Sequence, residues 1–129
     1  MNKIYFYGMP ECTTCQKALR RLEYHRVDNI EKRNIKDAPL SRAEIEKLAA
    51  MLGGIENLFS RRSTKYRELG LKDKTLSENE MLDLMASEYT FLKRPILVAG
   101  KTAIAGFFEK EYDAFFQTSN QKSNQSPRR

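Results

Sequence analysis

The sequence predicts a single α/β domain in which a βαβ unit and a C-terminal ββα unit flank a helical insertion. Two observations support this prediction. An aromatic, β-branched run precedes a Cys-x-x-Cys motif and a helical pattern, and two further apolar runs lie near the C-terminus. The chain of 129 residues is long enough for one domain with its own core.

The βαβ unit begins at residues 3–7 (Lys-Ile-Tyr-Phe-Tyr), whose side chains favour a buried strand. Gly8 and Pro10 end that strand, and from Cys15 onward apolar side chains follow helical spacing. Residues 29–35 predict a second strand, with imperfect alternation. We expect the two strands to pair in parallel, because a helix connects them.

The helical insertion is expected over residues 41–88. Two capping boxes, at residues 41–44 and 77–80, each place a serine before a helix and a glutamate three positions later. Gly53 and Gly54 end the first of these helices. This part of the chain is therefore expected to be mostly helical.

Strand character returns in residues 96–99 and 102–105, and the Gly-Lys turn between them predicts a hairpin. Residues 107–116 then predict an amphipathic helix that closes the domain. This order of elements, with Cys-x-x-Cys after the first strand, is typical of a thioredoxin-like architecture.

The predicted domain covers residues 1–116, and residues 117–129 are expected to form a disordered basic tail. The tail carries Lys122, Arg128 and Arg129 without an acid, which is half of the net charge of +6. The remaining charges nearly balance, so we do not expect direct binding of nucleic acid. A contact of the tail with nucleic acid or an acidic partner is the alternative.

The apolar runs and the cysteine count predict the cellular compartment of the protein. No run approaches the roughly 20 apolar residues of a membrane span, and the N-terminus lacks the pattern of a signal peptide. A lone Cys-x-x-Cys pair without further cysteines agrees with a reducing environment. We therefore expect a cytoplasmic protein that does not enter a membrane.

The strongest functional signal is Cys12-Thr13-Thr14-Cys15, which holds the only two cysteines of the chain. Free backbone N–H groups and the positive end of the helix dipole stabilise a thiolate at a helix start. In such motifs the pKa of the thiol falls below its ordinary value of about 8.5. Cys12 is therefore the expected nucleophile, and Cys15, one turn along, is placed to close a disulfide with it.

The cysteine pair has two other interpretations. Half of a zinc site usually needs four ligands, and the chain adds only His25 and carboxylates. A structural disulfide across so short a loop would remove little entropy from the unfolded chain. We expect no metal and no bound cofactor, and we expect His25 to pack or cap the first helix rather than to catalyse.

Three motifs, in this order, resemble those of the arsenate reductase (ArsC) and Spx family of thioredoxin-like proteins. They are residues 12–18 (Cys-Thr-Thr-Cys-Gln-Lys-Ala), 62–66 (Arg-Ser-Thr-Lys-Tyr) and 93–96 (Lys-Arg-Pro-Ile). The match covers about residues 3–116. The resemblance implies a thioredoxin-like fold with a helical insertion, an attacking Cys12, and basic residues Arg62 and Arg94 around it.

The resemblance also implies an oxyanion site. Backbone amides around Thr13 and Thr14, with the planar fork of Arg94, would supply donors and positive charge. Pro95 corresponds to the family's cis-proline facing the cysteines. Glutathione, glutaredoxin or thioredoxin would be the reductant. The alternative for Arg62 and Arg94 is an ordinary surface side chain.

Arsenate reductases of this family use a third arginine near the final hairpin. This chain has no arginine between Arg94 and Arg128 and has Ala-Gly-Phe at residues 105–107. We therefore expect arsenate reduction to be weak or absent, and predict a more general thiol-disulfide oxidoreductase.

The alternative is a redox-sensing transcription regulator like Spx. Glutathione-coupled reductases of the family work with one cysteine in the motif, whereas Spx proteins carry the pair as a switch. Gly54 matches the glycine at which Spx proteins contact the α subunit of RNA polymerase. A simple helix C-cap is the competing interpretation of Gly54.

Overall fold

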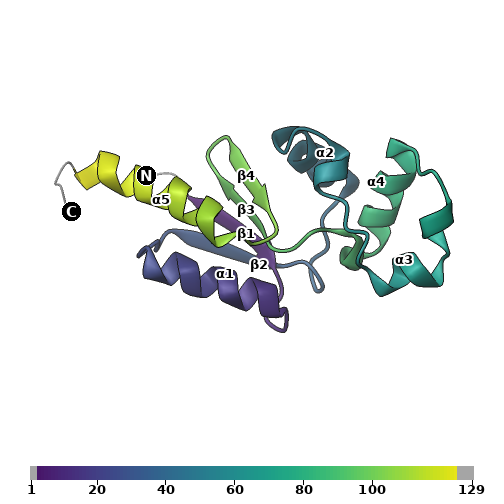
Figure 1. Cartoon of the computed structure of the whole chain (residues 1–129), viewed down its shortest axis with the longest axis horizontal. Helices are drawn as coiled ribbons and strands as arrows, with labels where there is room; N and C mark the ends of the chain where they lie inside the picture. The colour runs from purple at the N-terminus through teal and green to yellow at the C-terminus, as the bar shows by residue number, and fades with distance from the viewer. Residues whose placement is uncertain (1–2, 125–129) are drawn as a thin grey trace.

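The computed structural model describes residues 3–124, with side chains described over residues 3–116. It contains one four-stranded mixed sheet in the order β2-β1-β3-β4 (Figure 1). The strands are β1 (Ile4–Gly8), β2 (Ile30–Asn34), β3 (Ile96–Ala99) and β4 (Thr102–Ala105). β1 is parallel to β2 and antiparallel to β3, and β3 is antiparallel to β4. The predicted βαβ and ββα units are therefore confirmed.

Helices surround the sheet in two groups. α1 (Thr13–Tyr24) connects β1 to β2, and α5 (Glu109–Asn124) follows β4. The insertion lies between β2 and β3 and consists of α2 (Arg42–Met51), η1 (Ile55–Asn57), α3 (Thr64–Glu68), η2 (Leu71–Asp73), α4 (Glu78–Ser87) and η3 (Tyr89–Phe91). Figure 1 shows α2, α3 and α4 to one side of the sheet, away from α1 and α5.

Side chains alternate across the sheet and so divide the core in two. Ile4 and Phe6 of β1 and Leu97 of β3 pack with α1 and α5. Tyr7 and Ile96, one position along the same strands, pack instead with the helical insertion. This alternation follows from the two-residue period of a strand. Both cysteines belong to the core on the α1 and α5 side.

Local hydrogen bonds explain where α2 begins and ends. The Ser41 hydroxyl accepts the N–H of Glu44, and the Glu44 carboxylate accepts the N–H of Ser41, as the capping box predicts. At the other end Gly53 has φ +86°, and the N–H of Gly54 donates to the Ala49 carbonyl at 2.9 Å. The helix therefore ends in a Schellman motif. The second predicted box, at α4, is also present.

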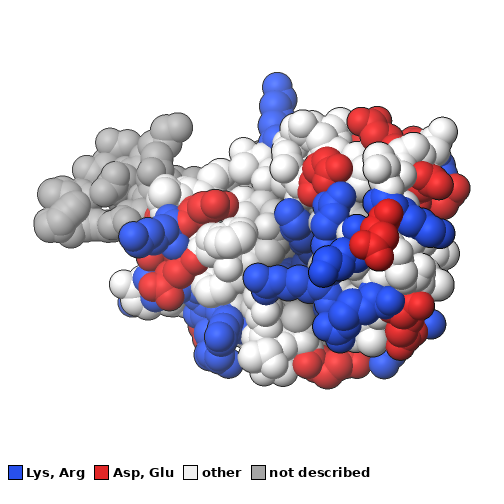
Figure 2. Space-filling view, turned by 45° about the vertical axis from the view of Figure 1, so that its right-hand side comes forward, with Lys and Arg blue, Asp and Glu red and all other residues white. Residues whose placement is uncertain are grey.

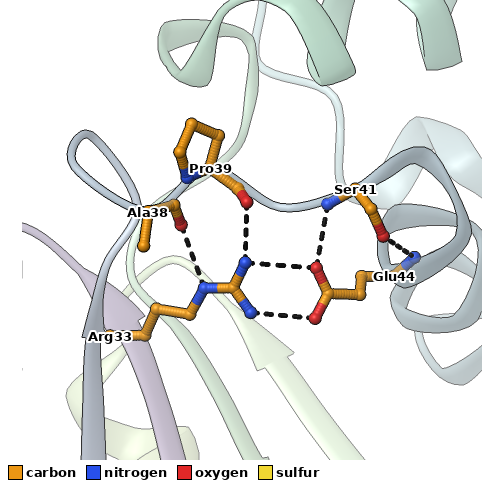
Figure 3. A network of polar contacts seen from close by, with 5 residues as sticks. All are labelled: Arg33, Ala38, Pro39, Ser41 and Glu44. Carbon is orange, nitrogen blue, oxygen red and sulfur yellow. Dashed lines mark hydrogen bonds and ion pairs between the residues drawn. The ribbon is translucent and has the colours of Figure 1, made fainter.

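One arginine ties edge strand β2 to the insertion (Figure 3). Arg33 donates from Nε to the Ala38 carbonyl at 2.9 Å and from Nη2 to the Pro39 carbonyl at 2.6 Å. Its Nη1 donates to Glu44 Oε2 at 2.8 Å. Because Glu44 also caps α2, a single side chain fixes the strand, the loop and the helix start together.

The final helix differs from its predicted extent. The sequence predicts an end at Phe116, whereas α5 continues through Asn124. Polar residues can extend a helix into solvent because each adds one backbone hydrogen bond to an existing turn. The rest of the predicted tail, residues 125–129, lies outside the described residues. In the part of the chain that the structure describes, no helix is both long and apolar enough to cross a membrane.

Candidate functional site

Cys12 occupies the N-cap of α1. Its backbone is extended (φ −82°, ψ 117°), and its Sγ accepts the backbone N–H of Cys15 at 3.2 Å. The side chain is half-buried, against the core that α1 and α5 share. An N-cap side chain faces the unpaired amides of the first turn. A negative charge on this sulfur would thus meet an N–H donor and the positive end of the helix.

Cys15 lies fully buried behind Cys12. It has no exposed surface and packs beneath β1. Burial, and then its hydrogen bond with Cys12, raise the pKa of the Cys15 thiol to about 12, whereas Arg94 acts to lower it. Both cysteines are reduced thiols. The two sulfurs therefore differ in access to solvent, and Cys15 stays protonated near neutral pH.

Gly8 is the reason that Cys15 fits so close to the sheet. A Cβ added to Gly8 would lie 2.8 Å from Cys15 Sγ and 3.2 Å from Phe6 Cε2. Side-chain atoms do not approach so closely without displacement. The last residue of β1 is thus glycine because the buried thiol occupies the space of its side chain.

Arg94 and Pro95 lie just before β3, and the bond between them is cis, as the resemblance implies. Arg94 Nη1 donates to the Tyr89 carbonyl at 3.2 Å, and its guanidinium lies over the Tyr89 ring. Arg94 Nε is buried and has no hydrogen-bond partner among the described residues. Arg94 is half-buried, and its charge acts to lower the pKa of Cys15.

The other predicted anion-binding residues are more exposed. Thr13 and Thr14 form the exposed first turn of α1. Arg62 is exposed, and among the described residues no hydrogen bond or ion pair joins its guanidinium to either cysteine. Its segment nevertheless lies beside the one that leads to Arg94, because Phe59 bridges Leu92 in an antiparallel arrangement.

The hairpin end lies next to Pro95. The N–H of Gly106 donates to the Pro95 carbonyl at 2.8 Å, and Ile96 pairs with Ala105. Residues 105–107 therefore lie beside the cis-proline, and they offer no guanidinium there.

Gly54 lies in the turn between α2 and η1. Its φ of +149° and ψ of 158° suit glycine alone, which explains it as part of the α2 terminus. An added Cβ would meet nothing within 4 Å, so the surface above it is open. Figure 2 shows Lys and Arg gathered on the face that includes the insertion, with Asp and Glu among them.

His25 packs against α5 and caps the C-terminal end of α1, as predicted. It is the C-cap of α1, its ring lies 5.9 Å from that of Phe116, and its Nε2 is 2.7 Å from Asp113 Oδ1. Asp113 also accepts two hydrogen bonds from Arg21, so the cluster joins α1 to α5. Within residues 3–124, no group of three or more His, Cys, Asp or Glu could hold a metal ion.

Sequence reasoning missed three residues of this site. Gly8 precedes the motif but reveals its contact with Cys15 only in three dimensions. Tyr89 anchors Arg94 through its backbone carbonyl, which carries no sequence signal. The amphipathic pattern of residues 107–116 predicts a buried face, but not that Tyr112 on this face lies in the core of Cys15.

The fold and the two cysteines at the start of α1 define a thioredoxin-like protein with a helical insertion. The ArsC family model matches residues 7–115, so the chain belongs to the ArsC family.

Two relatives are similar to this chain over most of its length. The uncharacterized protein YusI of Bacillus subtilis is 37% identical over 111 residues, which cover 84% of this chain and 93% of that protein. The global transcriptional regulator Spx of Streptococcus pneumoniae is 33% identical over 120 residues, which cover 92% of this chain and 90% of Spx.

Solved structures agree on the fold. SACOL0876 from Staphylococcus aureus is 38% identical with a TM-score of 0.73, and the match covers 86% of this chain and 96% of that one. A putative ArsC family related protein from Bacteroides fragilis is 29% identical with a TM-score of 0.78, covering 87% and 96%. Family and relatives together support either a thiol oxidoreductase or an Spx-like regulator.

Proposed function

We propose that this chain is a cytoplasmic thiol-disulfide oxidoreductase in which Cys12 attacks and Cys15 resolves. The observation that carries the proposal is the contrast between the two thiols. Cys12 caps α1, is half-buried and accepts an amide N–H, whereas Cys15 is fully buried directly behind it. Cys12 Sγ thus faces the free amides of the first turn of α1.

The proposed reaction has two steps. The Cys12 thiolate attacks one sulfur of a disulfide substrate, the substrate's S–S bond breaks, and the other half leaves as a thiolate that takes up a proton. Cys15 then loses its proton and attacks Cys12 Sγ. The mixed disulfide breaks, a Cys12–Cys15 disulfide forms, and the second half of the substrate leaves as a thiol. Two electrons pass from the protein to the substrate, and glutathione, glutaredoxin or thioredoxin would return them.

Arg94 would assist the first step. Its buried Nε has no partner within the described part of the chain, and such a group costs free energy unless something accepts its hydrogen bond. An anionic sulfur or a bound oxyanion could do so, and the amides of Thr13 and Thr14 and the cation of Arg62 would be further donors. Pro95, buried beside Arg94, would form the wall of this site.

The proposal is tested by two parallel assays on the same protein preparation. One follows arsenate reduction coupled to glutaredoxin with glutathione, or to thioredoxin, and the other follows reduction of a small disulfide. We expect disulfide reduction that depends on Cys12 and little arsenate turnover, because losing one preorganised donor typically costs about 10²–10³ in rate. Efficient arsenate turnover would instead identify the protein as an arsenate reductase. Inactivity in both assays would refute the proposal that it is an enzyme.

The second candidate is a regulator of the Spx kind, in which the same disulfide changes affinity for the α subunit of RNA polymerase. It is favoured by the relatives named Spx and by the open surface at Gly54. A pull-down with the C-terminal domain of that subunit, in reduced and oxidised states, separates the two. Binding that depends on Gly54 and on the redox state would support the regulator. A Gly53→Asn variant, altered beside the same turn, is the control for damage to the end of α2.

A further inference from the structure

Tyr112 on α5 carries a buried hydroxyl that nothing in the described structure satisfies. The residue has no exposed surface, and its OH lacks a hydrogen-bond partner among the described residues. Leaving a buried donor unpaired is costly, and a phenylalanine would fill the same space without that cost. Packing therefore explains the ring of Tyr112 but not its hydroxyl.

The surroundings of Tyr112 connect it to the resolving cysteine. It packs in the same core cluster as Cys15, and Phe107 meets its ring edge-on with centroids 4.9 Å apart. Burial, and then the nearby Cys15, raise the pKa of Tyr112. The phenol thus remains protonated and keeps a hydrogen to donate.

Cys15 needs a hydrogen-bond donor in the second step of the reaction, when its sulfur becomes a thiolate. Its proton must leave before its sulfur can attack, and burial opposes the charged form. Cys12 opposes that charge as well, while Arg94 and the Met9 backbone favour it. Once Cys12 forms a mixed disulfide with the substrate, its sulfur no longer carries the negative charge that repels a Cys15 thiolate.

We propose that the Tyr112 hydroxyl donates a hydrogen bond to the Cys15 sulfur as that sulfur becomes a thiolate. The inference rests on the proposed function, because it concerns the second step alone. There the Cys15 S–H bond breaks, the Cys15–Cys12 S–S bond forms, and the mixed disulfide breaks. The departing thiolate takes the proton. Tyr112 keeps its own proton and is neither oxidised nor reduced.

The test compares wild-type protein with Tyr112→Phe, which keeps the ring. Reduced protein is mixed with glutathione disulfide at a series of pH values, and samples are quenched with acid at intervals. Mass spectrometry then measures the amounts of mixed disulfide and internal disulfide separately. We expect Cys12 to react at its normal rate. Resolution should slow by about 10- to 100-fold, the effect of one hydrogen bond to a charged group, and its pH profile should move upward by about one to two units.

Two controls separate this role from a structural one. Tyr66→Phe removes a hydroxyl from the other core, where Tyr66 packs on Phe59, and should leave both steps unchanged. The Tm of Tyr112→Phe should equal or exceed that of the wild type, because the lost hydroxyl has no partner.

Three results would overturn the inference. The first is normal resolution with an unshifted pH profile in Tyr112→Phe, and the second is a lower Tm for that variant, which would reveal a structural partner. The third is a wild-type protein that never forms the internal disulfide. That last result would remove the proposed function itself, and it is seen before any variant is made.

Discussion

The contact between Gly8 and Cys15 makes a quantitative prediction about stability. In Gly8→Ala the new Cβ would lie 2.8 Å from Cys15 Sγ, and the thiol has no exposed surface into which it could move. Overpacking a closed core costs about 1–3 kcal/mol. Restricting the unfolded chain by replacing glycine with alanine returns roughly 0.4–1 kcal/mol. We expect Gly8→Ala to lower the free energy of unfolding by about 1–2 kcal/mol.

A double-mutant cycle shows whether Cys15 is the cause. In a Cys15→Ala background the sulfur is gone, so Gly8→Ala should be neutral or stabilising, with a coupling free energy of about 2 kcal/mol. Cys12→Ala is the matched control, because none of the three atoms nearest to the added Cβ belongs to Cys12. In that background Gly8→Ala should keep its full cost.

The assay is urea denaturation under reducing conditions, followed by circular dichroism, for the wild type and the five variants. Reduction matters because a disulfide would move the sulfur. Additive free energies for Gly8→Ala and Cys15→Ala would refute the packing argument. So would an equal rescue by Cys12→Ala, since it would mean that the cysteines act through the helix start rather than through this contact.

Two further predictions concern the ion pairs that join elements. Arg33→Ala should lower the free energy of unfolding by about 1–2 kcal/mol in urea denaturation, because charge-assisted bonds to Ala38, Pro39 and Glu44 are lost. Arg33→Lys should restore little of it, and full recovery would contradict the role of the planar fork. Arg21, and then His25, lower the pKa of Asp113 to about 2 from 3.8. Its ionised form therefore stabilises the fold above about pH 4, and this stabilisation disappears as the pH falls through about 2. Asp113→Ala should cost about 1–2 kcal/mol at neutral pH, allowing for solvent screening, and almost nothing near pH 2. A cost independent of pH would exclude the ion pair as its source.

Much of this fold could be predicted because its signals are local. The two Ser-x-x-Glu capping boxes, the Gly53-Gly54 ending and the hairpin around residues 100–101 each depend on a few adjacent residues, and all are present. The start of α1 at the first cysteine follows in the same way, since the N-cap sets which sulfur faces the free amides. The cis bond before Pro95 came from the resemblance instead.

What could not be predicted depends on side-chain contacts that leave no repeating pattern in the sequence. Arg94 turns back to a backbone carbonyl at Tyr89, and Arg33 reaches across a loop to Glu44, and neither contact has a periodic pattern. The sequence predicts too early an end for α5, because it changes from apolar to polar after Phe116, whereas the helix continues through Asn124.

The central claim is that Cys12 attacks and Cys15 resolves, and trapping the mixed disulfide tests it most directly. Each single cysteine-to-serine variant is incubated with glutathione disulfide at neutral pH, and its mass is recorded over time. The account predicts that Cys15→Ser rapidly accumulates one glutathione on Cys12, that Cys12→Ser stays almost unmodified, and that the wild type passes to the internal disulfide with a loss of two hydrogens. Rapid modification of Cys12→Ser, or a stable glutathione adduct on the wild type, would contradict it.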